Sequence, residues 1–244
     1  MSRMRRSQDA FGQALLDRLR GQQAIPVVER DDGNVDADGL AEMYWAEPKR
    51  WPAFQRRGLS QVRGRVLDVG CGAGRVALHL QQKGHDVVGV DTSPLAVRVC
   101  RERGVKQVRE LSITQVDRRL GAFDSIVMYG NNLALLGSPT GGRRLLKRLH
   151  GLTREGGRIV GETIDPYQTS EPVHLAYQRR NRRAGRMSGQ IRIRVRYRTY
   201  ATPWFNYLFL SQSELTTLID GTGWRLGRVY ESGGPGYVAV LLKV

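Results

Sequence analysis

The most constraining feature of this chain is a pair of apolar strands, the first ending in a glycine-dense turn and the second in an acid. They read Val66-Leu67-Asp68-Val69-Gly70-Cys71-Gly72-Ala73-Gly74 and Val87-Val88-Gly89-Val90-Asp91. An apolar strand, a glycine turn and a helical pattern are typical of half a dinucleotide-type fold, in which the acid receives ribose hydroxyls. Pyrophosphate sites favour G-x-G-x-x-G, whereas the glycines here fall at 70, 72 and 74. The negative carboxylate of Asp68 would repel a pyrophosphate, so this motif favours a cationic ligand.

Length and composition predict an ordinary globular protein. The 244 residues suit one large α/β domain with an insertion, and 40% hydrophobic with 25% charged residues is usual for such a domain. No apolar run approaches the ~20 residues needed to span a bilayer, and the basic N-terminus lacks the apolar core of a secretory signal. We therefore expect a cytoplasmic protein, monomeric or homodimeric, with no membrane partner.

The two cysteines are Cys71 in the glycine loop and Cys100 in a predicted helix, and neither has the spacing of metal ligands. We expect both to be small buried thiols rather than a disulfide or a nucleophile, and we expect no metal site. A reducing compartment suits such a chain.

The net charge of +16 comes from 39 basic residues, of which 5 are lysines. Such a charge argues for a polyanionic partner such as RNA. The skew toward arginine, together with 29 glycines, is also what a GC-rich coding sequence produces. Basic RNA-binding surfaces usually mix lysine with arginine and add aromatics. We favour the compositional explanation and keep nucleic acid as the alternative.

The two strand-end motifs resemble those of the class I S-adenosylmethionine-dependent methyltransferases. In that family the first motif is D-x-G-x-G-x-G, as in Asp68 to Gly74, and the second is an acid at the end of the next strand, as in Asp91. The resemblance implies that S-adenosylmethionine is the cofactor. Asp68 and the 70–74 loop would hold its methionine part. Asp91 would take both ribose hydroxyls, with Thr92 beside the ribose or adenine.

Two later segments extend the resemblance toward the adenine and the transferred methyl group. A predicted strand over 105–108 precedes Glu110 and Leu111, which would flank the adenine, although the family usually has aspartate and a small residue there.

The predicted strand 123–129 opens with phenylalanine and aspartate, another family feature. The carboxyl ends of parallel strands face the ligand. Tyr129 is therefore expected to contact the cofactor, and Asn131 and Asn132 to line the acceptor site.

The resemblance implies a Rossmann-like, doubly wound α/β fold with a seven-stranded sheet and a terminal antiparallel hairpin, here 224–230 and 236–243. Predicted helices cover 75–83, 93–104, 141–152 and 211–219, the last opened by a capping box of Ser211 and Glu214. A strand over 158–162 follows a glycine turn.

Three regions divide the chain on this interpretation. The methyltransferase core covers 60–164 and 211–244. Residues 1–59 form an N-terminal helical and aromatic cap segment, and 165–210 form an inserted β-rich ribbon that serves as a lid over the acceptor.

The N-terminal segment combines a weak helical stripe with acidic and aromatic residues. Residues 29–42 carry six acids and two glycines and are predicted to form a loop. Tyr44 and Trp45 are candidate acceptor contacts, because this segment often forms a wall of the substrate site in the resembled family. They could equally staple an N-terminal helix to the core.

Within the insertion, residues 191–198 alternate strictly between apolar residues and arginines, which predicts a strand with four arginines on one face. These arginines form either a track for a polyanion or a solvated face paired with carboxylates across a ribbon, and we favour the second. Glu171 and Pro172 mark a turn before a basic stretch. Tyr177 and Trp204 are the candidate acceptor contacts of this segment.

Methyl transfer of this kind is catalysed largely by positioning the acceptor. Glu162, Asp165 and His174 are the candidate general bases, with alternative roles in binding loop amides, capping a turn and lying on the surface. A small-molecule acceptor is expected first, RNA second, and a catalytically silent cofactor-binding module is the third possibility.

Overall fold

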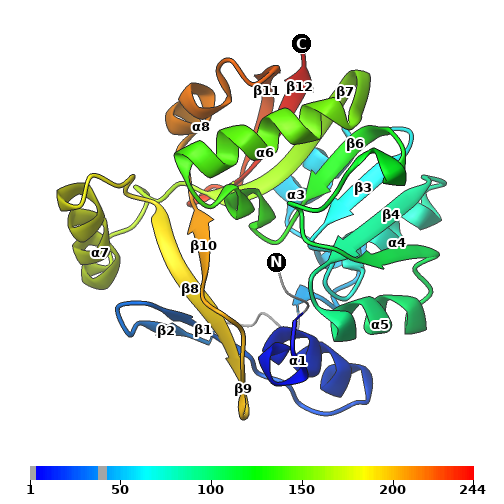
Figure 1. Cartoon of the computed structure of the whole chain (residues 1–244), viewed down its shortest axis with the longest axis horizontal. Helices are drawn as coiled ribbons and strands as arrows, with labels where there is room; N and C mark the ends of the chain where they lie inside the picture. The colour runs from blue at the N-terminus through cyan, green and yellow to red at the C-terminus, as the bar shows by residue number, and fades with distance from the viewer. Residues whose placement is uncertain (1–3, 38–42) are drawn as a thin grey trace. The chain divides into compact units, whose positions relative to one another are not determined.

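The computed structural model describes residues 4–37 and 43–244. Within them a seven-stranded sheet has the strand order β11-β12-β7-β6-β3-β4-β5 (Figure 1). Its strands are β3 (Val66–Val69), β4 (Val87–Asp91), β5 (Gln107–Glu110), β6 (Phe123–Met128), β7 (Thr153–Ile164), β11 (Trp224–Glu231) and β12 (Gly236–Lys243). The pairs β3–β4, β4–β5 and β6–β7 are parallel, whereas β12 runs antiparallel to β7 and β11. The predicted α/β class and terminal hairpin are confirmed.

The chain divides into two compact units. One comprises Met1–Trp51, Arg65–Val116 and Ile193–Phe205, and the other comprises Pro52–Gly64, Asp117–Arg192 and Asn206–Val244. Short 3-10 helices lie at Arg6–Gln8, Pro48–Arg50, Arg118–Leu120 and Asn132–Leu136. Among the residues that the structure describes, no helix is both long enough and apolar enough to cross a membrane.

In the first unit, β3 and β4 are buried along their whole length, as strands of a parallel sheet usually are. Helix α4 (Arg75–Gln82) follows the glycine loop, and α5 (Pro94–Glu102) follows β4. The hydroxyl of Ser93 accepts a hydrogen bond from the Ala96 N–H at 2.9 Å, and proline occupies the first helical position. The predicted start of this helix is confirmed.

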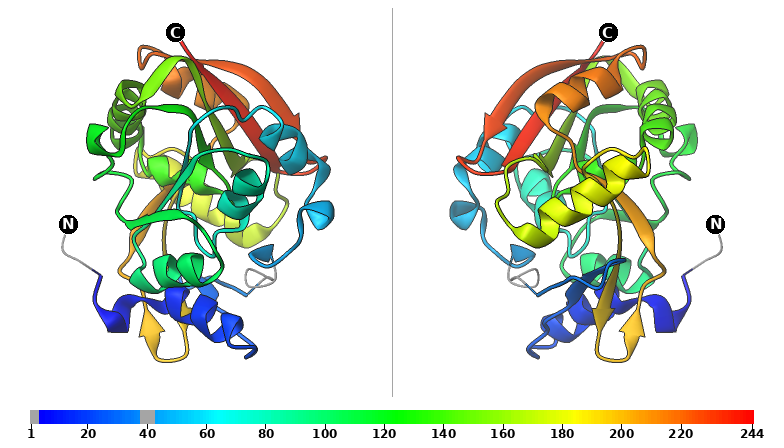
Figure 2. Two further views of the ribbon diagram at one scale, coloured as in Figure 1. Left: turned by 90° about the vertical axis from the view of Figure 1, so that its right-hand side faces the viewer. Right: turned by 90° about the vertical axis from the view of Figure 1, so that its left-hand side faces the viewer.

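The N-terminal helix α1 (Ala10–Leu19) belongs to the first unit and lies beside α5 (Figure 2). Leu15 and Leu16 of α1 pack with Ala96 and Val99 of α5 and with Ala73 of the glycine loop. The N-terminal segment is therefore built onto the half of the fold that carries the glycine loop.

A second sheet contains β1 (Val27–Arg30), β2 (Val35–Asp36), β8 (Gln190–Tyr197), β9 (Tyr200–Ala201) and β10 (Phe205–Leu208). The prediction of a loop over 29–42 is wrong at its start, because β1 and β2 form an antiparallel hairpin around Gly33 (φ +87°). β1 also pairs with β8, a partner that the local sequence does not reveal. Asp38 and Glu42 lie outside the described residues.

The predicted arginine strand is confirmed over β8, but its fourth arginine is not part of it. Arg198 has φ +51° and lies in the turn to β9. Glu29 of β1 accepts hydrogen bonds from Arg194 and Arg196, so the favoured interpretation of a paired ribbon is confirmed for these two arginines.

The second unit carries α3 (Ala53–Leu59), α6 (Pro139–Gly151), α7 (Pro172–Arg183) and α8 (Gln212–Ile219). The capping box at α8 is confirmed, since Glu214 N–H donates to the Ser211 hydroxyl and Ser211 N–H donates to the Glu214 carboxylate. β7 is longer than predicted and extends over both sides of the expected 158–162 strand.

Helix α7 differs from the expectation of a β-rich insertion with a turn at Pro172. Pro172 instead takes the first position of the helix, where its missing N–H costs no hydrogen bond. Only Tyr177, Gln178 and Asn181 of this helix are buried, and arginines fill much of the rest, so the sequence shows no clear apolar periodicity. The insertion thus contains one helix beside its strands.

Candidate functional site

The glycine loop after β3 requires its glycines. Gly70, Gly72 and Gly74 have φ values of +68°, +54° and +78°, a region that side chains rarely adopt. A Cβ on Gly74 would also approach Val105 Cγ2 to 2.7 Å. The loop therefore turns directly from β3 into α4 and leaves its backbone close to the end of the strand.

Asp91 is tied to this loop by its side chain. Its carboxylate accepts a hydrogen bond from Gly72 N–H at 2.9 Å and another from Ser93 N–H at 2.9 Å. Burial is the main reason that the pKa of the Asp91 carboxyl is raised, and the nearby charge of Asp9 adds to it. Thr92 beside it is exposed. The acid at the end of the second strand is thus held rigidly against the loop.

The predicted adenine-flanking residues lie next to Asp91. β5 covers Gln107–Glu110, two residues later than the predicted strand, and places Glu110 opposite Asp91 in the parallel pairing. Leu111 N–H donates to the Asp91 carbonyl at 2.9 Å. The structure therefore brings Glu110 and Leu111 to the same strand ends as the second motif.

Asp68 is a buried carboxylate with an oxygen that lacks a partner. Only 2% of its surface is exposed, and its Oδ2 makes no hydrogen bond. Burial is the largest cause that raises the pKa of Asp68 to about 7, and the charge of Asp91 adds to it. A buried acceptor without a donor is costly. The residues therefore fit a cationic ligand such as the ammonium of S-adenosylmethionine.

Aromatic side chains of the N-terminal segment lie against the loop. Phe11 and Tyr44 approach the position of an added Gly72 Cβ to 3.6 and 3.5 Å, and their rings meet edge to face at 5.2 Å. Arg103 donates to the carbonyls of Tyr44 and Ala73 at 3.3 and 2.5 Å. These contacts support the alternative in which the aromatic residues attach the N-terminal segment to the core. Phe11 is a contact that the sequence does not single out, although it forms a weak apolar stripe at helical spacing with Ala14, Leu15 and Leu19.

Trp45 lies in the same cluster, with the Arg103 guanidinium 4.9 Å from its ring centre. Trp204, the aromatic candidate from the insertion, is stacked by Arg194 at 4.7 Å. Both side chains are engaged within the first unit.

Cys71 and Cys100 are buried free thiols, as predicted. Their sulfur atoms lie 3.7 Å apart, and Cys100 Sγ donates to the Gly72 carbonyl at 3.1 Å. The contact with the Cys100 thiol, followed by burial, raises the pKa of the Cys71 thiol. The two thiols therefore pack against the glycine loop.

In the second unit, Glu162 holds the segment after β6. Its two oxygens accept hydrogen bonds from Gly130 N–H at 2.8 Å and from Gln55 Nε2 at 2.6 Å. Tyr129 is 4% exposed, and its hydroxyl donates to the Gln55 carbonyl at 3.1 Å. The Tyr129 side chain therefore packs toward α3, and Gln55 is a partner that sequence analysis missed.

The two asparagines after β6 occupy a constrained turn. Asn131 has φ +63°, and Asn132 Oδ1 accepts a hydrogen bond from the Tyr207 hydroxyl at 3.2 Å. Asp165 Oδ1 accepts from Tyr167 N–H at 2.9 Å, which is the turn-capping alternative to a general base. His174 lies half-buried on α7.

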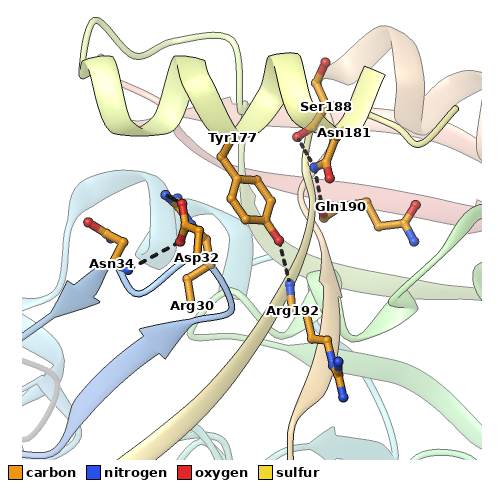
Figure 3. A network of polar contacts seen from close by, with 8 residues as sticks. All are labelled: Arg30, Asp32, Asn34, Tyr177, Asn181, Ser188, Gln190 and Arg192. Atoms are coloured by element: carbon orange, nitrogen blue, oxygen red, sulfur yellow. Dashed lines mark hydrogen bonds and ion pairs between the residues drawn. The ribbon is translucent and has the colours of Figure 1, made fainter. Parts of the chain in front are cut away.

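Tyr177 joins α7 to β8. It is 3% exposed, and its hydroxyl accepts a hydrogen bond from Arg192 N–H at 3.3 Å (Figure 3). Asn181, one turn further along α7, donates to the carbonyls of Ser188 and Gln190 at 3.1 and 2.7 Å. These contacts make Tyr177 a packing residue of the insertion.

The predicted site residues thus fall into two groups. The first unit holds Asp68, Gly70, Cys71, Gly72, Gly74, Asp91, Thr92, Glu110, Leu111, Tyr44, Trp45 and Trp204. The second holds Tyr129, Asn131, Asn132, Glu162, Asp165, His174 and Tyr177.

Comparison with known proteins agrees with this geometry. Residues 66–157 match the model of a methyltransferase domain family. A crystal structure of an S-adenosylmethionine-dependent methyltransferase from Bacteroides fragilis, in complex with S-adenosyl-L-homocysteine, is 25% identical and has a TM-score of 0.84. The match covers 100% of this chain and 98% of that one. The sheet order and terminal hairpin therefore define a methyltransferase fold.

Two curated relatives extend the comparison. A putative methyltransferase of Geobacillus sp. (strain WCH70) is 25% identical over 126 residues, 48% of this chain and 51% of the relative. Magnesium-protoporphyrin O-methyltransferase of Rhodobacter capsulatus is 36% identical over 93 residues, 35% of this chain and 41% of the relative. The chain spans about half the length of these relatives, or less. The matched domain and the fold are those of the class I S-adenosylmethionine-dependent methyltransferases, enzymes whose cofactor is S-adenosylmethionine.

Proposed function

We propose that this protein transfers the methyl group of S-adenosylmethionine to a small-molecule acceptor. The observation that carries the proposal is the buried Asp68, whose Oδ2 has no partner beside a loop of three glycines with positive φ. The cofactor is a cation, so an ionised Asp68 would pair with its ammonium group. The carboxylate of Asp91 would accept the ribose hydroxyls with its remaining lone pairs.

S-adenosylmethionine supplies an electrophilic sulfonium methyl group when it is bound. The role of this chain is then to orient the acceptor in line with that group, which is where most of the rate enhancement arises. We assign no general base. Both carboxylate oxygens of Glu162 already accept hydrogen bonds, one from a backbone N–H and one from a side-chain amide. Asp165 caps a turn. Nitrogen acceptors need no base at this step.

Two observations favour a small molecule over RNA. The relative from Rhodobacter capsulatus is named for a small-molecule acceptor, magnesium-protoporphyrin. Glu29 already pairs with Arg194 and Arg196, the central arginines of the strand that could have followed a phosphate backbone. The free buried thiols favour a reducing compartment, so we also propose a cytoplasmic location.

The experiment follows tritium from methyl-labelled S-adenosylmethionine into the dialysable and the RNA fractions of a bacterial extract. We expect label in the dialysable fraction, lost in Asp68→Ala. Labelling of RNA alone would contradict the small-molecule proposal. Binding of S-adenosylhomocysteine without any transfer would favour a silent cofactor-binding module.

A further inference from the structure

Asp9 is a buried acid that lies at the N-termini of two helices at once. It is 1% exposed and serves as the N-cap of α1, where its Oδ1 accepts from Gly12 N–H at 3.0 Å. Its Oδ2 accepts from Leu95 N–H in the first turn of α5 at 3.0 Å. Helix N-termini carry partial positive charge, so two of them stabilise one buried carboxylate.

The same carboxylate reaches the second motif of the cofactor site through Ser93. The Ser93 hydroxyl donates to Asp9 Oδ1 at 2.6 Å, while Ser93 N–H donates to Asp91 Oδ1 at 2.9 Å. The other oxygen of Asp91 accepts from Gly72 N–H. A continuous chain of hydrogen bonds therefore runs from α1 to the glycine loop.

Gly12 makes this approach of α1 to α5 possible. An added Cβ at Gly12 would overlap the Ser93 hydroxyl and the Asp9 carboxylate. The glycine has no positive φ, so close approach is the reason that it suits this position.

We propose that Asp9 is a positioning residue of the cofactor site, which fixes Ser93 and through it the Asp91 carboxylate that receives the ribose. The inference rests on the proposed use of S-adenosylmethionine. It adds the N-terminal helix to the machinery that binds the cofactor. The first unit thus contains its own support for the ribose-binding acid, separated from it by 82 positions in the sequence.

The test measures S-adenosylhomocysteine affinity by calorimetry in wild type, Asp9→Asn, Ser93→Ala and the double variant. Asparagine is a good N-cap, so α1 should still form. An asparagine side chain has one acceptor oxygen and cannot accept from Gly12 N–H, Leu95 N–H and the Ser93 hydroxyl together. We expect the affinity for S-adenosylhomocysteine to fall about tenfold, the equivalent of one hydrogen bond to a charged group. The double variant should lose no more than about the larger single loss, because both residues act through one contact.

Asp17→Asn is the matched control. Asp17 is 2% exposed on the same helix, but its carboxylate accepts from the Tyr197 hydroxyl at 3.0 Å, far along the helix from Ser93. Hydrogen exchange of the Ser93 amide, followed by NMR, gives a second readout. We expect faster exchange in Asp9→Asn and unchanged exchange and affinity in Asp17→Asn.

The outcomes separate this inference from the proposed function. If wild type does not bind S-adenosylhomocysteine, the proposed function fails. If wild type binds and folded Asp9→Asn has wild-type affinity and wild-type Ser93 exchange, Asp9 has no positioning role. Equal losses in Asp9→Asn and Asp17→Asn, or additive losses in the double variant, would also overturn the inference.

Discussion

Glu29 and Arg194 lie directly opposite one another in the antiparallel pairing of β1 with β8, and two nitrogens of the guanidinium donate to the carboxylate at 2.9 and 3.0 Å. Arg196 donates to the same carboxylate at 3.2 Å. Burial alone would raise the pKa of Glu29, but the hydrogen bonds from the two arginines lower it. The charge of this strand is thus partly balanced inside the protein.

RNA binding is therefore expected to be weak and independent of sequence. Binding of bulk RNA measured against salt concentration should show a low affinity that falls as salt rises, because it depends only on released counterions. Glu29→Gln should raise this affinity by freeing two arginines. Tight, sequence-dependent binding at physiological salt that disappears in Arg192→Ala/Arg194→Ala/Arg196→Ala would favour an RNA acceptor.

Cofactor binding should weaken as the pH falls through about 7. Burial, reinforced by the charge of Asp91, raises the pKa of Asp68 to about 7, and a protonated Asp68 cannot pair with the cofactor ammonium. Calorimetry of S-adenosylhomocysteine at several pH values, in buffers of different ionisation enthalpy, should detect proton release near neutral pH. Asp68→Asn should bind weakly and lose this pH dependence; the opposite pH trend in wild type would contradict the assignment.

The same carboxyl predicts a stability trend for the protein without cofactor. Its pKa is higher in the folded chain than the ordinary value of 3.8, so the folded state holds the proton more tightly. The contribution of Asp68 to stability is present below about pH 4 and is lost as the pH rises to about 7. Chemical unfolding of wild type and Asp68→Asn across this range isolates the effect, because asparagine does not titrate.

Glu162 is expected to stabilise the loop after β6 rather than to act as a base. Glu162→Ala leaves the Gly130 N–H and the Gln55 amide without their acceptor and should lower the free energy of unfolding by about 2 kcal/mol. Glu162→Gln should lose much less. In Glu162→Gln, the new side-chain carbonyl oxygen can accept from Gly130 N–H. If the Gln55 amide flips, its Oε1, which has no partner in the wild type, can accept from the new side-chain NH₂ group. Urea unfolding measures both variants.

The alternative role for Glu162 has a distinct signature. If Glu162 is the general base, Glu162→Gln should retain stability and S-adenosylhomocysteine affinity but lose about 10²–10⁴-fold in turnover. Methyl transfer at saturating acceptor decides between the two roles.

Much of the core was predictable because its signals are local. The strands around Val66 and Val87 are short apolar runs, and the caps at Ser93 and Ser211 act within one helical turn. The tight turn at Gly70, Gly72 and Gly74 was predictable for the same reason, since the positive φ values that it needs depend on single residues. The acceptor lid and the three-region division remain predictions.

Features that depend on distant partners were missed. The β1 hairpin is completed by β8, with Val28 opposite Val195, and no window around Glu29 contains that information. Helix α7 buries three side chains among arginines, so its periodicity is weak. Asp9 and Ser93 are 84 positions apart, and only the folded chain shows that they meet.

The most direct test of the account is calorimetric titration of S-adenosylhomocysteine into wild type, Asp91→Ala and the control Asp86→Ala. Asp86 is a half-exposed acid just before β4, at the opposite end of the strand, where it pairs with Arg65. Wild type and Asp86→Ala should bind alike. Asp91→Ala should lose about 1.5–3 kcal/mol for each lost hydrogen bond to a charged group. Absence of binding to wild type, or unchanged affinity in Asp91→Ala, would contradict the central claim.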